Sequence, residues 1–125
     1  MTGAKSAGEK VSMKFAHTTL HVSDPERSAK FYEEVVGLRE VRRIGEDIIF
    51  LADESSDTEL ELIRAKGEVS CTACVAIGFY CEKVGSYHQK LAEEGYDVSN
   101  VIAPSPETHF FFVKDPDGHS VQFID

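Results

Sequence analysis

The chain repeats one order of predicted elements, and this internal repeat restricts its fold more than any other feature of the sequence. In each half, hydrophobic periodicity predicts a strand, then a helix, then three further strands. The residues of the two halves are only weakly similar, but the order and lengths of the elements agree. The expected elements are a strand at 15–22, a helix from 25 to 36, strands near 38–44, 47–52 and 58–64, then a strand at 73–80, a helix at 82–94, a strand near 96–101 and a hairpin at 110–125.

The first helix has a clear start and a clear end in the sequence. Ser23 or Asp24 is suited to accept hydrogen bonds from the free backbone N–H groups of the first turn, and Pro25 fits the position that follows. Gly37 is suited to cap the C-terminal end. Residues 65–70 are polar and are predicted to link the two halves.

The last stretch of the chain predicts a β-hairpin. The turn is Asp115-Pro116-Asp117-Gly118, in which proline presets φ for the second position and glycine tolerates a positive φ. An apolar run precedes this turn and an alternating pattern follows it. Gln122 is a lone carboxamide among the apolar residues of the last strand. It falls on the face opposite to its neighbours, which indicates a polar role on that face.

Superposing the two halves aligns four side chains that carry chemistry. The first strands of the halves align His17 with Cys74, and the last strands align Glu61 with Gln122. A pseudo-twofold axis between the halves would bring the four side chains together. We therefore expect them to face one concavity, either within one chain or across a dimer.

Composition restricts the partners and the location of the protein. The net charge of −9 argues against nucleic acid and anionic membrane surfaces as partners. No apolar run approaches the roughly 20 residues of a transmembrane helix, and the N-terminus lacks the apolar segment of a signal peptide. Three cysteines without export signals indicate reduced thiols and a cytoplasmic protein. We expect a flexible tail at residues 1–12 and a single domain at 13–125, with modules of about 14–65 and 72–125.

Several stretches of the chain resemble one known family. They are the strand and helix start at 15–24, Ser-Ala-Lys-Phe-Tyr at 28–32, Val-Gly-Leu at 36–38, Glu-Leu-Glu-Leu at 59–62 and Phe-Val-Lys-Asp-Pro-Asp-Gly at 112–118. These motifs resemble the vicinal oxygen chelate superfamily, which includes glyoxalase I, bleomycin-resistance proteins and extradiol dioxygenases. The resemblance covers residues 14–125. It implies an α+β fold of two βαβββ modules that form curved, concave sheets with helices outside.

Within that superfamily, the chain looks most similar to small bacterial glyoxalase I, the lactoylglutathione lyase. This resemblance implies a metal-dependent lyase or isomerase that acts on a small vicinal-oxygen substrate, such as the hemithioacetal of methylglyoxal and glutathione. The implied cofactor is a divalent metal such as Ni²⁺ or Zn²⁺, and its implied ligands are His17, Glu61, Cys74 and Gln122. The residues expected to line a substrate pocket are His21 and Phe111.

Two of the implied ligands depart from the pattern of glyoxalase I. Cys74 stands where that enzyme has His, and Gln122 stands where it has the Glu that serves as both ligand and base. Glutamine offers a carbonyl oxygen but no carboxylate, so Glu61 is the strong base candidate and Gln122 is the other predicted catalytic residue. The alternative is a non-catalytic protein of the same superfamily that binds a small molecule, as drug-resistance proteins do. For either function we expect a homodimer, because exposed sheet edges are usually covered.

Each candidate also has a purely structural interpretation. His17 and Glu61 suit a half-exposed strand, and Cys74 suits a small buried hydrophobic position. Cys71-Thr72-Ala73-Cys74 is a weak redox or zinc signal, because it leads into a strand and no second pair of this spacing is present. His88 is expected on the buried stripe of the second helix, and His119, beside a glycine, is expected to be exposed.

Overall fold

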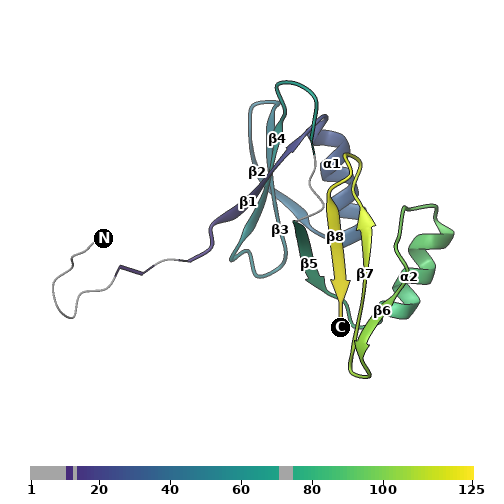
Figure 1. The fold of residues 1–125 in the computed structure, drawn as a ribbon. Coiled ribbons are helices and arrows are strands. Elements are labelled where there is room, and N and C mark those ends of the chain that lie inside the picture. Colours follow the sequence, from purple (N-terminus) through teal and green to yellow (C-terminus); the bar gives the residue numbers. More distant parts are fainter. Residues whose placement is uncertain (1–10, 13, 71–74) are drawn as a thin grey trace.

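A computed structural model describes residues 11–12, 14–70 and 75–125 of the chain. Its elements follow the order predicted from the repeat (Figure 1). The first half comprises β1 (His17–Val22), α1 (Pro25–Phe31), the π-helix η1 (Tyr32–Val36), β2 (Arg39–Ile44), β3 (Ile48–Ala52) and β4 (Glu59–Arg64). The second half comprises β5 (Ala76–Tyr80), α2 (Val84–Glu93), β6 (Ile102–Ser105), β7 (Thr108–Lys114) and β8 (Ser120–Ile124).

The strands form two four-stranded sheets with the same topology. The first has the order β1-β4-β3-β2 and the second the order β5-β8-β7-β6. In each sheet the first strand pairs in parallel with the last, and the other pairs are antiparallel. The parallel pair needs a crossover, which the helix of each half supplies. The prediction of an α+β fold with two βαβββ modules is therefore confirmed.

One predicted strand lies in a different place. The sequence predicts a strand near 96–101, whereas β6 begins at Ile102 and includes Pro104. Val98 forms only an isolated bridge with Val113. Proline is tolerated in β6 because this strand lies at the edge of its sheet, where a missing N–H group leaves no partner unsatisfied.

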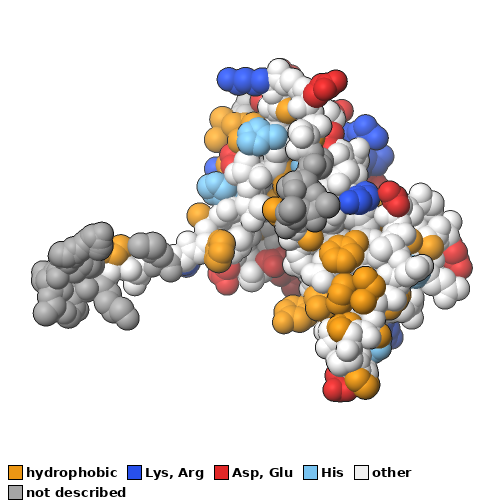
Figure 2. All heavy atoms as spheres, viewed as in Figure 1, with side chains coloured by type: hydrophobic (Ala, Val, Ile, Leu, Met, Phe, Trp, Pro, Cys, Tyr) orange, Lys and Arg blue, Asp and Glu red, His pale blue; other side chains and the backbone are white. Residues whose placement is uncertain are grey.

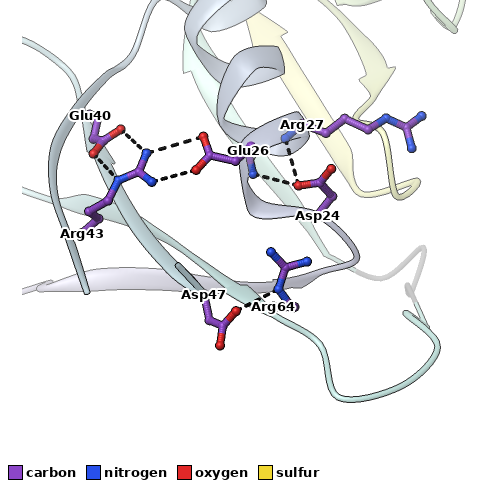
Figure 3. Close-up of polar contacts among 7 residues, drawn as sticks. All are labelled: Asp24, Glu26, Arg27, Glu40, Arg43, Asp47 and Arg64. Carbon is purple, nitrogen blue, oxygen red and sulfur yellow. Dashed lines mark hydrogen bonds and ion pairs between the residues drawn. The ribbon is translucent and has the colours of Figure 1, made fainter. Parts of the chain in front are cut away.

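The first helix begins as predicted and ends in an unpredicted way. The carboxylate of Asp24 accepts hydrogen bonds from the N–H groups of Glu26 and Arg27, which makes Asp24 the N-cap (Figure 3). The helix then widens into the π-helical turn η1 before Gly37 ends it with a φ of 89°. A π-helical turn rotates the side chains relative to an α-helix, and its first residue, Tyr32, is fully buried.

A set of exposed ion pairs covers the outer side of the first module. Arg43 on β2 binds both Glu40 and Glu26, so it ties the sheet to α1 (Figure 3). The hydrogen bond from Arg43 lowers the pKa of Glu40, and the two carboxylates raise the pKa of Arg43. Solvent screens such exposed pairs, so they contribute little to stability.

The helix-facing sides of both sheets contribute to one hydrophobic core. α1 packs on β3 and β4, and α2 packs on β7. Along each strand, alternate residues point to the helix, and these are the buried ones. The fully buried core side chains are Val22, Tyr32, Ile49, Leu51, Leu62, Val84, Leu91, Phe111, Val113 and Val121.

Polar contacts join the two modules at the side of this core. The hydroxyl of Tyr32 in the first module donates a hydrogen bond of 2.8 Å to Oδ2 of Asp115 in the second. The hydroxyl of Tyr87 on α2 donates to the backbone carbonyl of Val35, and burial raises the pKa of Tyr87. The backbone N–H of Ser23 donates to Asp117. These bonds fix the orientation of one module relative to the other.

Replacing Gly37 with alanine is expected to lower the free energy of unfolding by about 1 kcal/mol. A Cβ at this position meets no heavy atom within 4 Å, so the cost comes from the φ of 89° alone. Gly85 in α2 is the matched control, because it also has open space but no positive φ. Its replacement with alanine is expected to stabilise the protein by about 0.5 kcal/mol. Urea unfolding followed by circular dichroism measures both, and a loss of stability of similar size in both variants would contradict this explanation.

Candidate functional site

Each sheet has a second face that neither α1 nor α2 covers, and the candidate residues that the structure describes lie on this outward face. In β1 the buried residues are Leu20 and Val22, so His17, Thr19 and His21 point to the opposite side. In β4 the buried residues are Leu60 and Leu62, so Glu59 and Glu61 point outward too. The parallel pairing of β1 with β4 places Thr19 directly beside Glu61.

His17 and Glu61 form a close pair on this face. Nε2 of His17 lies 3.5 Å from Oε1 of Glu61. The hydroxyl of Thr19 donates a hydrogen bond of 2.6 Å to the same carboxylate oxygen and so fixes its orientation. The side chain of His17 is 45% exposed and that of Glu61 is 13% exposed. The pair is therefore accessible on the imidazole side and held in place on the carboxylate side.

The geometry of this pair fits two ligands of a divalent metal ion. Zinc-type bonds of about 2.1 Å in a tetrahedral arrangement place two ligand atoms about 3.4 Å apart, close to the observed 3.5 Å. An imidazole nitrogen and a carboxylate oxygen also suit such an ion chemically. Among the described residues, no group of three or more His, Cys, Asp or Glu side chains could hold a metal. The pair is therefore at most half of a four-ligand set.

Gln122 lies on the corresponding face of the second sheet. It pairs in register with Gly78 on β5 and Phe112 on β7. Its Oε1 atom would lie 3.1 Å from a Cβ built on Gly78, so the glycine leaves room for the amide. Within the described part of the chain, Gln122 makes no hydrogen bond with His17 or Glu61. Cys74, the remaining implied ligand, lies outside the described residues.

The two predicted pocket residues have different surroundings. His21 lines a cavity of about 270 Å³ between β1 and the start of β5, together with Thr19, Ala76 and His119. Phe111 is fully buried and packs against Phe123 and His88. The prediction that Phe111 lines a pocket is therefore wrong. It points toward α2, because the outward residues of β7 are its neighbours Phe110 and Phe112.

Asp115 forms a buried network that the sequence analysis did not identify. Its carboxylate accepts hydrogen bonds from the Tyr32 hydroxyl and from the backbone N–H groups of Asp117 and His119. Nδ1 of His119 lies 2.9 Å from Oδ2 of Asp115 and donates to it. The side chain of His119 is only 16% exposed, so the prediction of an exposed imidazole is wrong. The sequence signal for this contact was the spacing of four residues between Asp115 and His119 across the turn.

Phe50 and Arg42 complete the outward face of the first sheet, and neither was singled out from the sequence. The ring of Phe50 lies edge-on to the imidazole of His17, with ring centroids 6.4 Å apart. The guanidinium of Arg42 covers the same ring from above. The face therefore combines an imidazole, a carboxylate, an aromatic ring and a guanidinium group.

The protein is therefore a small α+β protein of two βαβββ modules, each with one open sheet face. The open face of the first sheet carries the His17–Glu61 pair. The family model described as "Glyoxalase/Bleomycin resistance protein/Dioxygenase superfamily" matches residues 14–123. The chain belongs to this superfamily.

Similar proteins include both enzymes and a binding protein. The lactoylglutathione lyase of Haemophilus influenzae is 30% identical over an alignment of 125 positions, which covers 90% of this chain and 93% of that protein. A possible glyoxalase from Bacillus cereus has a TM-score of 0.74 and 25% identity, with coverage of 91% of this chain and 100% of that one. TnmS3, an antibiotic-binding protein from a Streptomyces species, has a TM-score of 0.73 and 20% identity, with coverage of 92% and 97%.

Proposed function

We propose that the protein is a metal-dependent lyase or isomerase of the glyoxalase I type, acting on a small vicinal-oxygen substrate such as the hemithioacetal of methylglyoxal and glutathione. The observation that carries the proposal is the His17–Glu61 pair, whose separation of 3.5 Å fits two ligands of one ion. The similarity to bacterial lactoylglutathione lyases supports the same reaction type.

In this proposal His17 and Glu61 hold the divalent metal, and the bound metal supplies polarisation of the vicinal oxygen atoms of the substrate. Glu61 also moves the proton between the two carbon atoms. Thr19 and His17 both contact Oε1 of Glu61, so Oε2 is the oxygen free to accept the proton. Gln122 contributes an amide that orients a substrate oxygen, because a carboxamide does not take up protons at neutral pH.

A second copy of the chain completes the site in this proposal. The described residues of one chain bring together only two ligands, and Gln122 lies on the other sheet. The outward face of that sheet is apolar: Phe110 and Phe112 pack edge to face, and Tyr80 is 91% exposed. Hydrophobic side chains gather over the β7–β8 half of the molecule in Figure 2. The proposal assigns this apolar surface to self-association. No helix among the described residues is long and apolar enough to cross a membrane.

A non-catalytic binding protein is the second candidate. The observation that favours it is Gln122, which stands where a catalytic carboxylate is expected. Gly78 has no side chain and so leaves room for the amide of Gln122. A protein of the same fold binds an antibiotic, so the fold accommodates a bound small molecule. The cavity of about 270 Å³ beside His21 is large enough for a small ligand.

Titration with Ni²⁺ tests the proposal. Wild-type protein is expected to bind Ni²⁺. Its affinity for Ni²⁺ is expected to fall on dilution, because dilution separates the two chains that together supply the ligands. The double variant Cys74→His/Gln122→Glu is expected to bind on the order of tenfold tighter, since it restores a second imidazole and a second carboxylate. Calorimetry measures binding, and an assay of hemithioacetal isomerisation measures activity in both proteins.

The same experiment separates the two candidates. Ni²⁺ binding together with isomerisation by wild-type protein supports the enzyme. If neither protein binds Ni²⁺ measurably, the ligand assignment is wrong and the binding protein replaces it. If the metal binds but wild-type protein is inactive and the double variant is active, Gln122 has removed the chemistry from an intact metal site.

A further inference from the structure

Arg42 lies on the outward face of the first sheet in an unusual arrangement. The central carbon of its guanidinium group lies 3.6 Å from the centroid of the Phe50 ring, which is a close cation–π contact. One terminal nitrogen donates a hydrogen bond of 2.9 Å to Oε1 of Glu59. The ring beneath it is only 4% exposed, so the guanidinium is held flat against an apolar surface while half of the Arg42 side chain remains exposed.

The register of the strands places this guanidinium beside the candidate metal site. Arg42 pairs with Phe50 across β2 and β3, and Phe50 pairs with Glu61 across β3 and β4. Adjacent strands are about 4.8 Å apart, so the backbones of Arg42 and Glu61 are about 10 Å apart. The guanidinium group lies over the ring of Phe50, on the strand between them, so it is closer to Glu61 than the backbone of Arg42 is.

The donors of Arg42 are only partly used. A guanidinium group has several N–H donors in a planar fork that matches a carboxylate. Within the part of the chain that the structure describes, the side chain of Arg42 makes one hydrogen bond, to Glu59. The remaining N–H groups are available to a ligand on the outward face.

The charges of this face also favour an anionic ligand. Glu59 and Glu61 carry negative charge and Arg42 carries positive charge, so the three side chains together have an excess of one negative charge. A divalent cation at Glu61 would turn this into an excess of one positive charge. A substrate with one carboxylate would then bring the face to neutrality.

We propose that Arg42, stacked on Phe50, binds a carboxylate of the substrate. The inference rests on the proposed metal site at His17 and Glu61, and it narrows the substrate class. The substrate is a compound with vicinal oxygen atoms and a free carboxylate. Arg42 is in this view a residue that determines specificity through contact with the substrate, and Glu59 is a positioning residue that holds the guanidinium over the ring.

Two matched hydroxamates test this inference on Ni²⁺-loaded protein. Succinohydroxamate carries a carboxylate near its vicinal oxygens, and butyrohydroxamate has a methyl group in its place. Wild-type protein is expected to bind the former about tenfold more tightly, as a charged hydrogen-bonded pair allows. Arg42→Met should abolish this preference, and Arg42→Lys should keep part of it. The control is Arg39→Met, since Arg39 lies on the same strand and, among the described residues, its side chain hydrogen-bonds Ser56 and not Glu59. The preference of this variant should match that of wild-type protein.

A second measurement is independent of the metal. In NMR spectra without Ni²⁺, the side-chain Nε–H signal of Arg42 is expected to shift with succinohydroxamate and not with butyrohydroxamate. Equal affinity for the two compounds together with an unmoved Arg42 signal would overturn the role of Arg42, even if Ni²⁺ binds. A selective shift of that signal in a protein that binds no Ni²⁺ would support the carboxylate site and reject the proposed metal site.

Discussion

Replacing Asp115 with alanine is expected to lower the free energy of unfolding by about 3–5 kcal/mol. The carboxylate of Asp115 is fully buried and accepts hydrogen bonds from Tyr32, Asp117 and His119. Its removal takes away the buried acceptor that these three hydrogen bonds share. It also removes the hydrogen bond between the first helix and the last hairpin. Urea unfolding followed by circular dichroism measures the loss.

Asp53→Ala is the matched control for this prediction. Asp53 also accepts hydrogen bonds in a turn, from Ser55 and Ser56, but the turn is exposed. Water replaces the lost acceptor there, so a cost of about 1 kcal/mol or less is expected. Tyr32→Phe provides a second comparison, because it removes the bond from Tyr32 to Asp115 and leaves the bonds from Asp117 and His119 to Asp115 in place. If Asp115→Ala costs no more than Asp53→Ala, the buried network does not join the modules in the way described.

Replacing Glu61 with glutamine is expected to weaken Ni²⁺ binding by about a hundredfold or more. The substitution keeps the shape of the side chain but removes the charge that attracts the cation, and it leaves His17 as the only strong ligand of the pair. The hydrogen bond from Thr19 can persist, because the amide oxygen still accepts it. Calorimetry with Ni²⁺ measures the change.

Glu59→Gln separates a specific ligand from a general effect of charge. Glu59 lies two residues from Glu61 on the same face, and its carboxylate forms an ion pair with Arg42, whereas the carboxylate of Glu61 lies against His17. The two substitutions remove the same charge from neighbouring positions. Glu59→Gln is therefore expected to change the Ni²⁺ affinity only a few-fold through screened electrostatics. Equal losses in the two variants would mean that the metal responds to the overall charge of the face.

Much of the fold follows from the sequence because the signals are local and repeated. The Asp24 cap, the Gly37 stop and the turn at 115–118 each fix a boundary within a few residues. The order of elements then appears twice, so each half supports the interpretation of the other. The pairing of β1 with β4 follows from that order, and it brings His17 and Glu61 together.

The features that were missed depend on contacts between distant residues. Nothing near Tyr32 in the sequence predicts a π-helical turn, and the hydroxyl of its first residue, Tyr32, bonds Asp115, which is 83 positions away. The orientation of Phe111 depends on the register of β7 against β8, and a shift by one residue reverses every side chain. Arg42 contacts Phe50 because β2 pairs with β3, so this contact can be recognised only once the strands are paired.

The bond between Tyr32 and Asp115 has a consequence for how the chain reaches its folded state during synthesis. Tyr32 is made early and its acceptor lies 83 positions later, close to the end of the chain. The first module therefore leaves the ribosome before Asp115 can accept the hydrogen bond of the Tyr32 hydroxyl, and with one side of the shared core uncovered. The first module stays incomplete until the final hairpin has left the ribosome. A chain truncated before the hairpin of β7 and β8 lacks Asp115 and the part of the core that covers the first module. Complete folding of the first module therefore depends on the C-terminal residues of the chain.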